Sequence, residues 1–64
     1  MKLSLKALRI NANVSVEEAA KIADVTTNTI YRWENNQEIF KKASIEAIAK
    51  LVEAYGASMD NLEI

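Results

Sequence analysis

The sequence predicts an all-α fold, a compact helical bundle that forms a single domain over residues 1–64. Apolar residues recur three and four positions apart through most of the chain, which is the spacing of one helix face. No stretch alternates apolar and polar residues with the period of two that marks a half-buried strand. A serine or threonine precedes each periodic segment, in the position of a helix N-cap. The chain contains no Cys, His or Pro, so a core without disulfides must stabilise it.

The first helix is expected to follow Ser4 and to end near Ala12. Leu5 and Leu8 lie one turn apart and, with the alanine at its end, give this helix an inner face. Asn13 suits a left-handed exit, because asparagine tolerates a positive φ better than most residues. The pattern therefore predicts one short helix that buries a narrow apolar stripe and then reverses the chain.

A capping box marks the start of the second helix. Ser15 is followed three residues later by Glu18, the pair that closes the amino end of a helix, so the helix begins near Val16. It is expected to end at Asp24, where a left-handed backbone is strained but tolerated by aspartate. Its inner face consists of small residues that let a partner helix approach closely, namely Ala19, Ala20 and Ala23.

The third helix is expected to run from Thr26, its N-cap, to Asn35. Ile30 and Trp33 give it a narrow apolar stripe, which leaves four polar side chains on the outer face: Thr27, Asn28, Tyr31 and Arg32. Such side chains suit base edges and phosphates, although a solvated helix face explains the same composition. The turn before this helix favours the first interpretation, because two helices joined by about three or four residues are typical of a DNA-binding helix-turn-helix.

Residues 35–43 lack helical periodicity and are predicted to form a loop. Ile39 or Phe40 is expected to reach the core from this loop. Lys41 and Lys42 are expected to stay exposed, where they can meet a phosphate backbone. A solvated pair of lysines explains the same two residues nearly as well.

Two further helices are predicted after this loop. The first follows Ser44 and stops at Gly56, and its inner stripe consists of Ile45, Ile48, Leu51, Val52 and Tyr55. A short final helix within residues 58–62 is expected to turn Met59 and Leu62 inward. All predicted elements are helical, and no internal repeat or low-complexity tract interrupts them.

Composition excludes several classes of function. Without Cys or His, and without a glycine-rich loop, the sequence shows no catalytic residues and no metal or cofactor site, so we do not expect an enzyme. No apolar run is long enough to span a bilayer, and the amino end lacks a signal peptide, which leaves a cytoplasmic location as the expectation. The net charge is −1, divided into +2 over residues 1–42 and −3 over residues 43–64. This distribution permits a nucleic-acid partner but does not predict one.

Four stretches carry a resemblance to a known family: residues 14–20 (VSVEEAA), 25–35 (VTTNTIYRWEN), 44–46 (SIE) and 56–62 (GASMDNL). Together they resemble the Cro/repressor-type, or XRE-like, helix-turn-helix family of phage and bacterial transcription regulators over nearly the whole chain. The resemblance implies a five-helix bundle of the lambda-repressor-like DNA-binding type. It also implies that the third helix enters the major groove of a pseudo-palindromic operator, usually as part of a dimer.

The same resemblance assigns roles to individual residues. It places base contacts on Thr27, Asn28 and Arg32. It places contacts to the DNA backbone, or ancillary contacts, on Val16, Thr26, Tyr31, Asn36, Lys41 and Lys42. Arg9 and Glu34 match a pair that forms a buried or half-buried salt bridge in relatives, so their role is structural.

Three positions depart from the family pattern. Val16 stands where glutamine is frequent and can offer only an apolar contact, such as one to a thymine methyl. Asp24 replaces the glycine usual in the turn and adds negative charge on the DNA side. Asn36 replaces a second common glycine, and asparagine can adopt the left-handed conformation. These departures predict a modest affinity for DNA.

We therefore expect a sequence-specific regulator that occupies double-stranded operator DNA, without chemistry, cofactor, small-molecule ligand or membrane partner. A protein-interaction module, of the antitoxin or antirepressor kind, is the alternative, because fold alone does not determine function. This alternative is supported by the negative net charge of the chain and by three apolar side chains expected at the surface, Ile10, Ile22 and Tyr31. A weak homodimer is expected through the carboxyl-terminal segment Ala57–Ile64, since one such module buries little surface on DNA.

Overall fold

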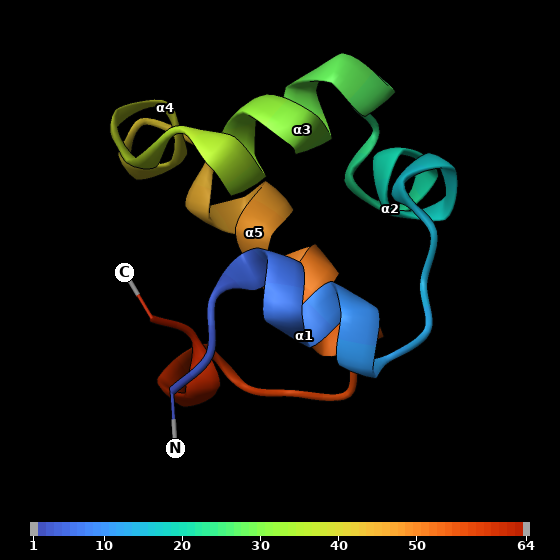
Figure 1. The fold of residues 1–64 in the computed structure, drawn as a ribbon, viewed down its shortest axis with the longest axis vertical. Helices are drawn as coiled ribbons and strands as arrows, with labels where there is room; N and C mark the ends of the chain where they lie inside the picture. The colour runs from blue at the N-terminus through green and yellow to red at the C-terminus, as the bar shows by residue number, and fades with distance from the viewer. Residues whose placement is uncertain (1, 64) are drawn as a thin grey trace.

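Five α-helices and one 3₁₀ helix form within residues 2–63, the part of the chain that the computed structural model describes (Figure 1). They are α1 (Leu5–Asn11), α2 (Val16–Ala23), α3 (Thr27–Asn35), α4 (Gln37–Lys41), α5 (Ile45–Ala54) and the 3₁₀ helix η1 (Met59–Asn61). The all-α fold class predicted from the sequence is confirmed. An isolated parallel bridge between Leu3 and Leu62 joins the segment before α1 to the segment after η1.

Side-chain caps begin the helices where the sequence predicts them. The hydroxyls of Ser4 and Thr26 each accept from the backbone N–H three residues later, at 3.1 and 3.2 Å respectively. Ser15 and Glu18 form the complete capping box, in which the Glu18 N–H donates to Ser15 Oγ over 3.1 Å. A cap of this kind stabilises a helix by about 1 kcal/mol, so these residues determine where α1, α2 and α3 begin.

Three residues with positive φ reverse the chain at helix ends. Asn13 follows α1 with φ 59°, and Asp24 follows α2 with φ 58°. Gly56 follows α5 with φ 75°, a region where a residue with a Cβ is strained. All three left-handed exits agree with the sequence analysis.

The core forms where α2 packs against both α3 and α5. Alanines on α2 allow close approach to these two helices, since Ala19, Ala20 and Ala23 are all buried. Larger side chains fill the remaining space, and the most deeply buried of them are Ile30, Leu51 and Val52. Helix α3 therefore packs against α2 on one side, and α4 packs against it as well.

The prediction of a loop over residues 35–43 is wrong, because α4 occupies residues 37–41. Asn36 is extended, with φ −133°, and not left-handed, and its Oδ1 accepts from the N–H groups of Glu38 and Ile39 at 3.0 and 3.2 Å. Asn36 is thus the N-cap of a helix too short to show a periodic pattern. Both Ile39 and Phe40 pack against the core from it.

Two side chains predicted to face inward are exposed. Ile45 retains 78% of its surface, since it is the first residue of α5 and helix side chains tilt toward the amino end, beyond the packed turns. Met59 retains 39% of its surface, since it lies on η1, a single 3₁₀ turn. The residue directly after this turn, Leu62, is the one that is buried in the core. The other members of both predicted stripes are buried.

Candidate nucleic-acid interface

Helix α3 is fixed in position from its inner side and from its amino end. Ile30 is fully buried and Trp33 lies in the same core. The turn that precedes the helix is closed by a hydrogen bond from the Val25 N–H to the Ala20 carbonyl, at 2.9 Å. Because the turn and the core both constrain α3, its outer face has a defined orientation relative to the rest of the bundle.

The outer face of α3 is polar and open to solvent. All four side chains predicted there are exposed, and they lie on successive turns: Thr27, Asn28, Tyr31 and Arg32. Asn28 and Arg32 are four residues apart and therefore neighbours on the helix surface. Hydrogen-bonding groups of this kind can address base edges and phosphate oxygens.

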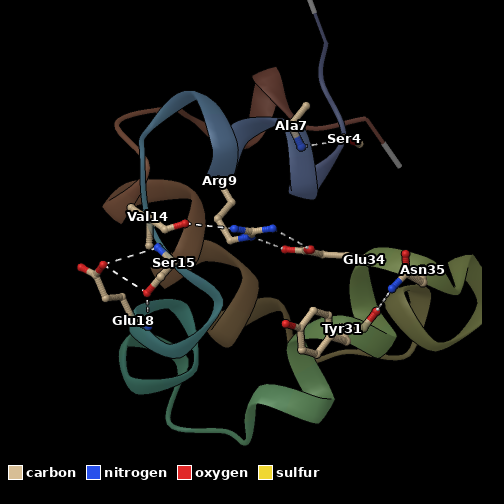
Figure 2. A network of polar contacts seen from close by, with 9 residues as sticks. All are labelled: Ser4, Ala7, Arg9, Val14, Ser15, Glu18, Tyr31, Glu34 and Asn35. Atoms are coloured by element: carbon tan, nitrogen blue, oxygen red, sulfur yellow. Dashed lines mark hydrogen bonds and ion pairs between the residues drawn. The ribbon is translucent and has the colours of Figure 1, made fainter.

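Asn35 belongs to the same face, although the sequence analysis did not include it. It is exposed and stands seven residues after Asn28, two turns along the helix. Its Nδ2 donates to the Tyr31 carbonyl over 2.9 Å (Figure 2). The seven-residue spacing was the available signal, and it extends the polar face to the end of α3.

An ion pair between Arg9 and Glu34 ties α1 to the inner side of α3 (Figure 2). Arg9 Nε donates to Glu34 Oε2 over 2.8 Å and Nη2 donates to Oε1 over 3.3 Å, while Nη1 donates to the Val14 carbonyl over 3.0 Å. The Glu34 side chain is 2% exposed and that of Arg9 is 12% exposed. The structure thus brings together the two residues that the sequence analysis pairs, and it places them beneath the outer face of α3 instead of on it.

This pair sets the electrostatics of its surroundings. The hydrogen bond to Glu34 raises the pKa of Arg9, which stays charged. Burial raises the pKa of Tyr55 to about 12, with the Glu34 carboxylate adding to the effect and Arg9 opposing it. Among the described residues the Tyr55 hydroxyl has no hydrogen-bond partner. The charged groups under α3 are therefore neutralised internally.

The residues expected to contact the DNA backbone differ in how accessible they are. Val16 lies in the core and is 8% exposed, which leaves its side chain almost no surface for DNA. Thr26 and Asn36 are exposed but use a side-chain oxygen to cap α3 and α4, so only their remaining polar atoms are available. Lys41 and Lys42 are exposed at the carboxyl end of α4, where cations also stabilise the helix dipole.

Acidic side chains are exposed on α2 and on the turn that leads into α3. Asp24 is exposed in the turn that leads into this helix. Glu17 is exposed in the first turn of the neighbouring helix, α2. Carboxylates near a phosphate backbone repel it, so these residues lower the affinity for any polyanion regardless of sequence.

Residues 2–63 show neither a metal site nor a membrane-spanning element. They contain no group of three His, Cys, Asp or Glu side chains placed to hold a metal ion. Of the helices in this part of the chain, none combines the length and the apolar character that crossing a bilayer requires.

Comparison with known proteins gives one match. A family model described as helix-turn-helix matches residues 5–62, a span that covers every α-helix and the 3₁₀ helix η1. Comparisons with curated proteins and with solved structures find no match. Within the matched span, α2 and α3 are the two helices joined by the tight turn at Asp24.

Proposed function

Because the chain belongs to the XRE-type helix-turn-helix family of DNA-binding regulators, we propose that it is a sequence-specific transcription regulator of the phage or prophage Cro/repressor kind. It acts by occupying operator DNA. The observation that carries this proposal is the outer face of α3, where every side chain predicted for DNA contact is exposed on a rigidly anchored helix. The helix-turn-helix presents its second helix in the major groove, and here that helix is α3.

Base recognition is assigned to Asn28, Arg32 and Thr27. The Asn28 side-chain amide can donate to N7 of adenine and accept from the N6 amino group, which makes a bidentate pair. The Arg32 guanidinium can donate to O6 and N7 of guanine or to a phosphate. Each good bidentate pair contributes about 1–3 kcal/mol of discrimination against a wrong base. Thr27, at the first position of α3, reaches the bases or the adjacent phosphate through its hydroxyl.

Backbone contacts orient the protein on the operator. Lys41 and Lys42 supply the positive charge at the carboxyl end of α4, and Tyr31 with the free atoms of Thr26 and Asn36 adds hydrogen bonds. Val16 is omitted from this set because its side chain is buried. The operator is pseudo-palindromic and two copies of the chain occupy it, since one small module buries too little surface for tight specific binding.

A protein-interaction module is the second candidate. Ile10 and Tyr31 favour it, because they expose 56% and 50% of their surfaces. Ile22, the third apolar residue considered for this role, is partly buried and packs against the core. Scattered surface apolar residues are normal in soluble proteins, so this candidate has the weaker support.

Selection of labelled DNA from a random pool tests the proposal. Enrichment of one two-fold-symmetric motif is expected, with Asn28→Ala and Arg32→Ala each losing preference at defined base pairs. Asn11→Ala and Lys50→Ala are matched controls, because both residues are exposed on helices other than α3. A pool without enrichment, or equal loss of affinity on all sequences in the α3 variants, would contradict base reading and favour the protein partner.

A further inference from the structure

Tyr31 is the one aromatic side chain that is exposed in the described part of the chain. Trp33 and Tyr55 are buried, and Phe40 packs against the core. Tyr31 instead keeps 50% of its surface on the outer face of α3. Its ring therefore brings a large apolar surface into a face that is otherwise polar.

The outer face of α3 divides into two rows of side chains. Residues four apart are neighbours on a helix, so Thr27 and Tyr31 form one row, while Asn28 and Arg32 form the other. Asn35 adjoins both rows at the carboxyl end of the helix. The first row offers a methyl group and an aromatic ring beside its hydroxyls, whereas the second offers an amide and a guanidinium. The two rows therefore suit different features of a base pair.

The neighbours of Tyr31 on the helix leave its ring accessible. Asn35 Nδ2 donates to the Tyr31 carbonyl, and Figure 2 shows the ring directed away from that amide. Glu34, three residues after Tyr31, is held in the ion pair with Arg9. The ring thus stands on an anchored part of α3 and keeps a surface that a ligand can cover.

The major groove presents one apolar group that the row of Thr27 and Tyr31 can contact. This group is the C5-methyl of thymine, since the other groups on the base edges are hydrogen-bond donors and acceptors. 5-Methylcytosine carries the same methyl group at the same position of the pyrimidine ring. A tyrosine ring can cover such a methyl group while its hydroxyl, at the far end of the ring, still reaches a phosphate.

We propose that Tyr31, together with the methyl group of Thr27, recognises the C5-methyl group of a pyrimidine in the operator. DNA binding then responds to methylation, because 5-methylcytosine restores a contact that unmethylated cytosine lacks. The inference rests on the proposed function, since it requires α3 in the major groove. The contact lies within one half-site and is independent of the dimer segment expected over Ala57–Ile64, whose last residue, Ile64, lies outside the described residues.

Replacement of single thymines by uracil in the selected operator tests the contact, because it removes only the methyl group. At one position of each half-site this replacement should weaken binding roughly 3- to 5-fold, as expected for one buried methyl group. Tyr31→Ala should abolish the difference at that position, whereas Tyr31→Phe should keep it, since the ring makes the contact. Alanine favours helices, so circular dichroism of Tyr31→Ala should show an intact fold. Asn11→Ala, on α1, is the matched control and should keep the full difference.

A random pool synthesised with 5-methylcytosine in place of cytosine tests the response to methylation. Selection from this pool should enrich cytosine, at the position where the uracil replacement weakens binding, more often than selection from the ordinary pool does. The Tyr31→Ala variant should select the same bases at this position from both pools. The uracil and methylcytosine experiments therefore distinguish the two sources of the methyl group.

The outcomes separate this inference from the proposed function. Equal affinity for thymine and uracil at every position, or a difference that persists in Tyr31→Ala, would overturn the methyl contact. If Asn28→Ala still loses preference at a defined base pair in that case, the DNA-binding proposal stands. A pool from which the protein enriches no motif would overturn both proposals.

Discussion

Replacing Arg9 by methionine is the most informative single perturbation of this fold. Arg9 makes two hydrogen bonds to the Glu34 carboxylate and one to the Val14 carbonyl, and it connects α1 to α3. Methionine keeps much of the length and packing of the stem but removes the guanidinium. The substitution leaves the carboxylate of Glu34, which is 2% exposed, without its cation.

The loss of folding free energy expected for Arg9→Met is large compared with the total stability of the domain. Removing one member of a buried ion pair costs about 3–5 kcal/mol, because the remaining charge is desolvated and unpaired. A domain of this length has a total stability of roughly 3–10 kcal/mol at typical values per residue. Arg9→Met should therefore lower the melting temperature by at least roughly 12 °C, since each kcal/mol shifts it by about 4–8 °C in small domains.

Urea unfolding followed by the fluorescence of Trp33, which lies in the core, measures this loss. The double variant Arg9→Met/Glu34→Met should recover most of it, because an apolar pair has no buried charge to compensate. Lys50→Met is the control, since Lys50 pairs with Glu46 at 3.8 Å on the surface and should change stability by less than about 0.5 kcal/mol. A loss below about 1 kcal/mol for Arg9→Met, or a double variant no more stable than Arg9→Met, would refute the reasoning.

Three further outcomes are expected. The pKa of Tyr55 is raised to about 12, so the unfolded chain, with its ordinary value near 10, releases this proton first and stability falls between these pH values. In urea unfolding between pH 8 and 12, the free energy of unfolding of Tyr55→Phe should fall by about 2–3 kcal/mol less than that of the unchanged protein. The same pH dependence in both proteins would contradict this prediction. Asp24→Gly should tighten binding to all DNA in a titration, whereas Asn13→Gly, which relieves a similar backbone conformation at the end of α1, should leave binding unchanged. Thr26→Ala should lower the free energy of unfolding by about 1 kcal/mol, measured by thermal unfolding, because it removes the side-chain cap of α3. An unchanged stability would contradict a stabilising role of this cap.

The sequence predicted the helices whose boundaries are set by local chemistry. Ser15 and Thr26 cap their helices through bonds within three residues, and Asp24 ends α2 in the left-handed conformation. Such interactions depend on neighbours in the chain, so the residue types suffice to locate them. Helix α4 was missed for the complementary reason: at five residues it is shorter than two turns and carries no periodic signal.

The features that no local sequence pattern predicts depend on distant segments. Arg9 and Glu34 are 25 residues apart, and a family resemblance, not a local pattern, paired them. Ile45 continues the apolar period of α5 and yet lies in solvent, because burial depends on what stands opposite and nothing in the described chain covers that end of the helix. The apolar groove lined in part by Phe40, Ile48 and Met59 has the same origin, since these residues come from three separate elements, α4, α5 and η1.

The acidic total charge is consistent with a DNA-binding role once affinity and discrimination are separated. Contacts to phosphates raise affinity for every sequence alike, and carboxylates such as Asp24 near α3 reduce that common contribution. The base contacts proposed for Asn28 and Arg32 add discrimination whatever the net charge of the chain, so a weak electrostatic contribution would increase the ratio of specific to non-specific binding. Because the ion pair under α3 is internal and the lysines lie at the end of α4, the charges that hold α3 in place are distinct from those proposed to meet the DNA backbone. Substitutions on the outer face of α3 would then change the preference among DNA sequences without a large effect on stability, because stability depends on Arg9, Glu34 and the core.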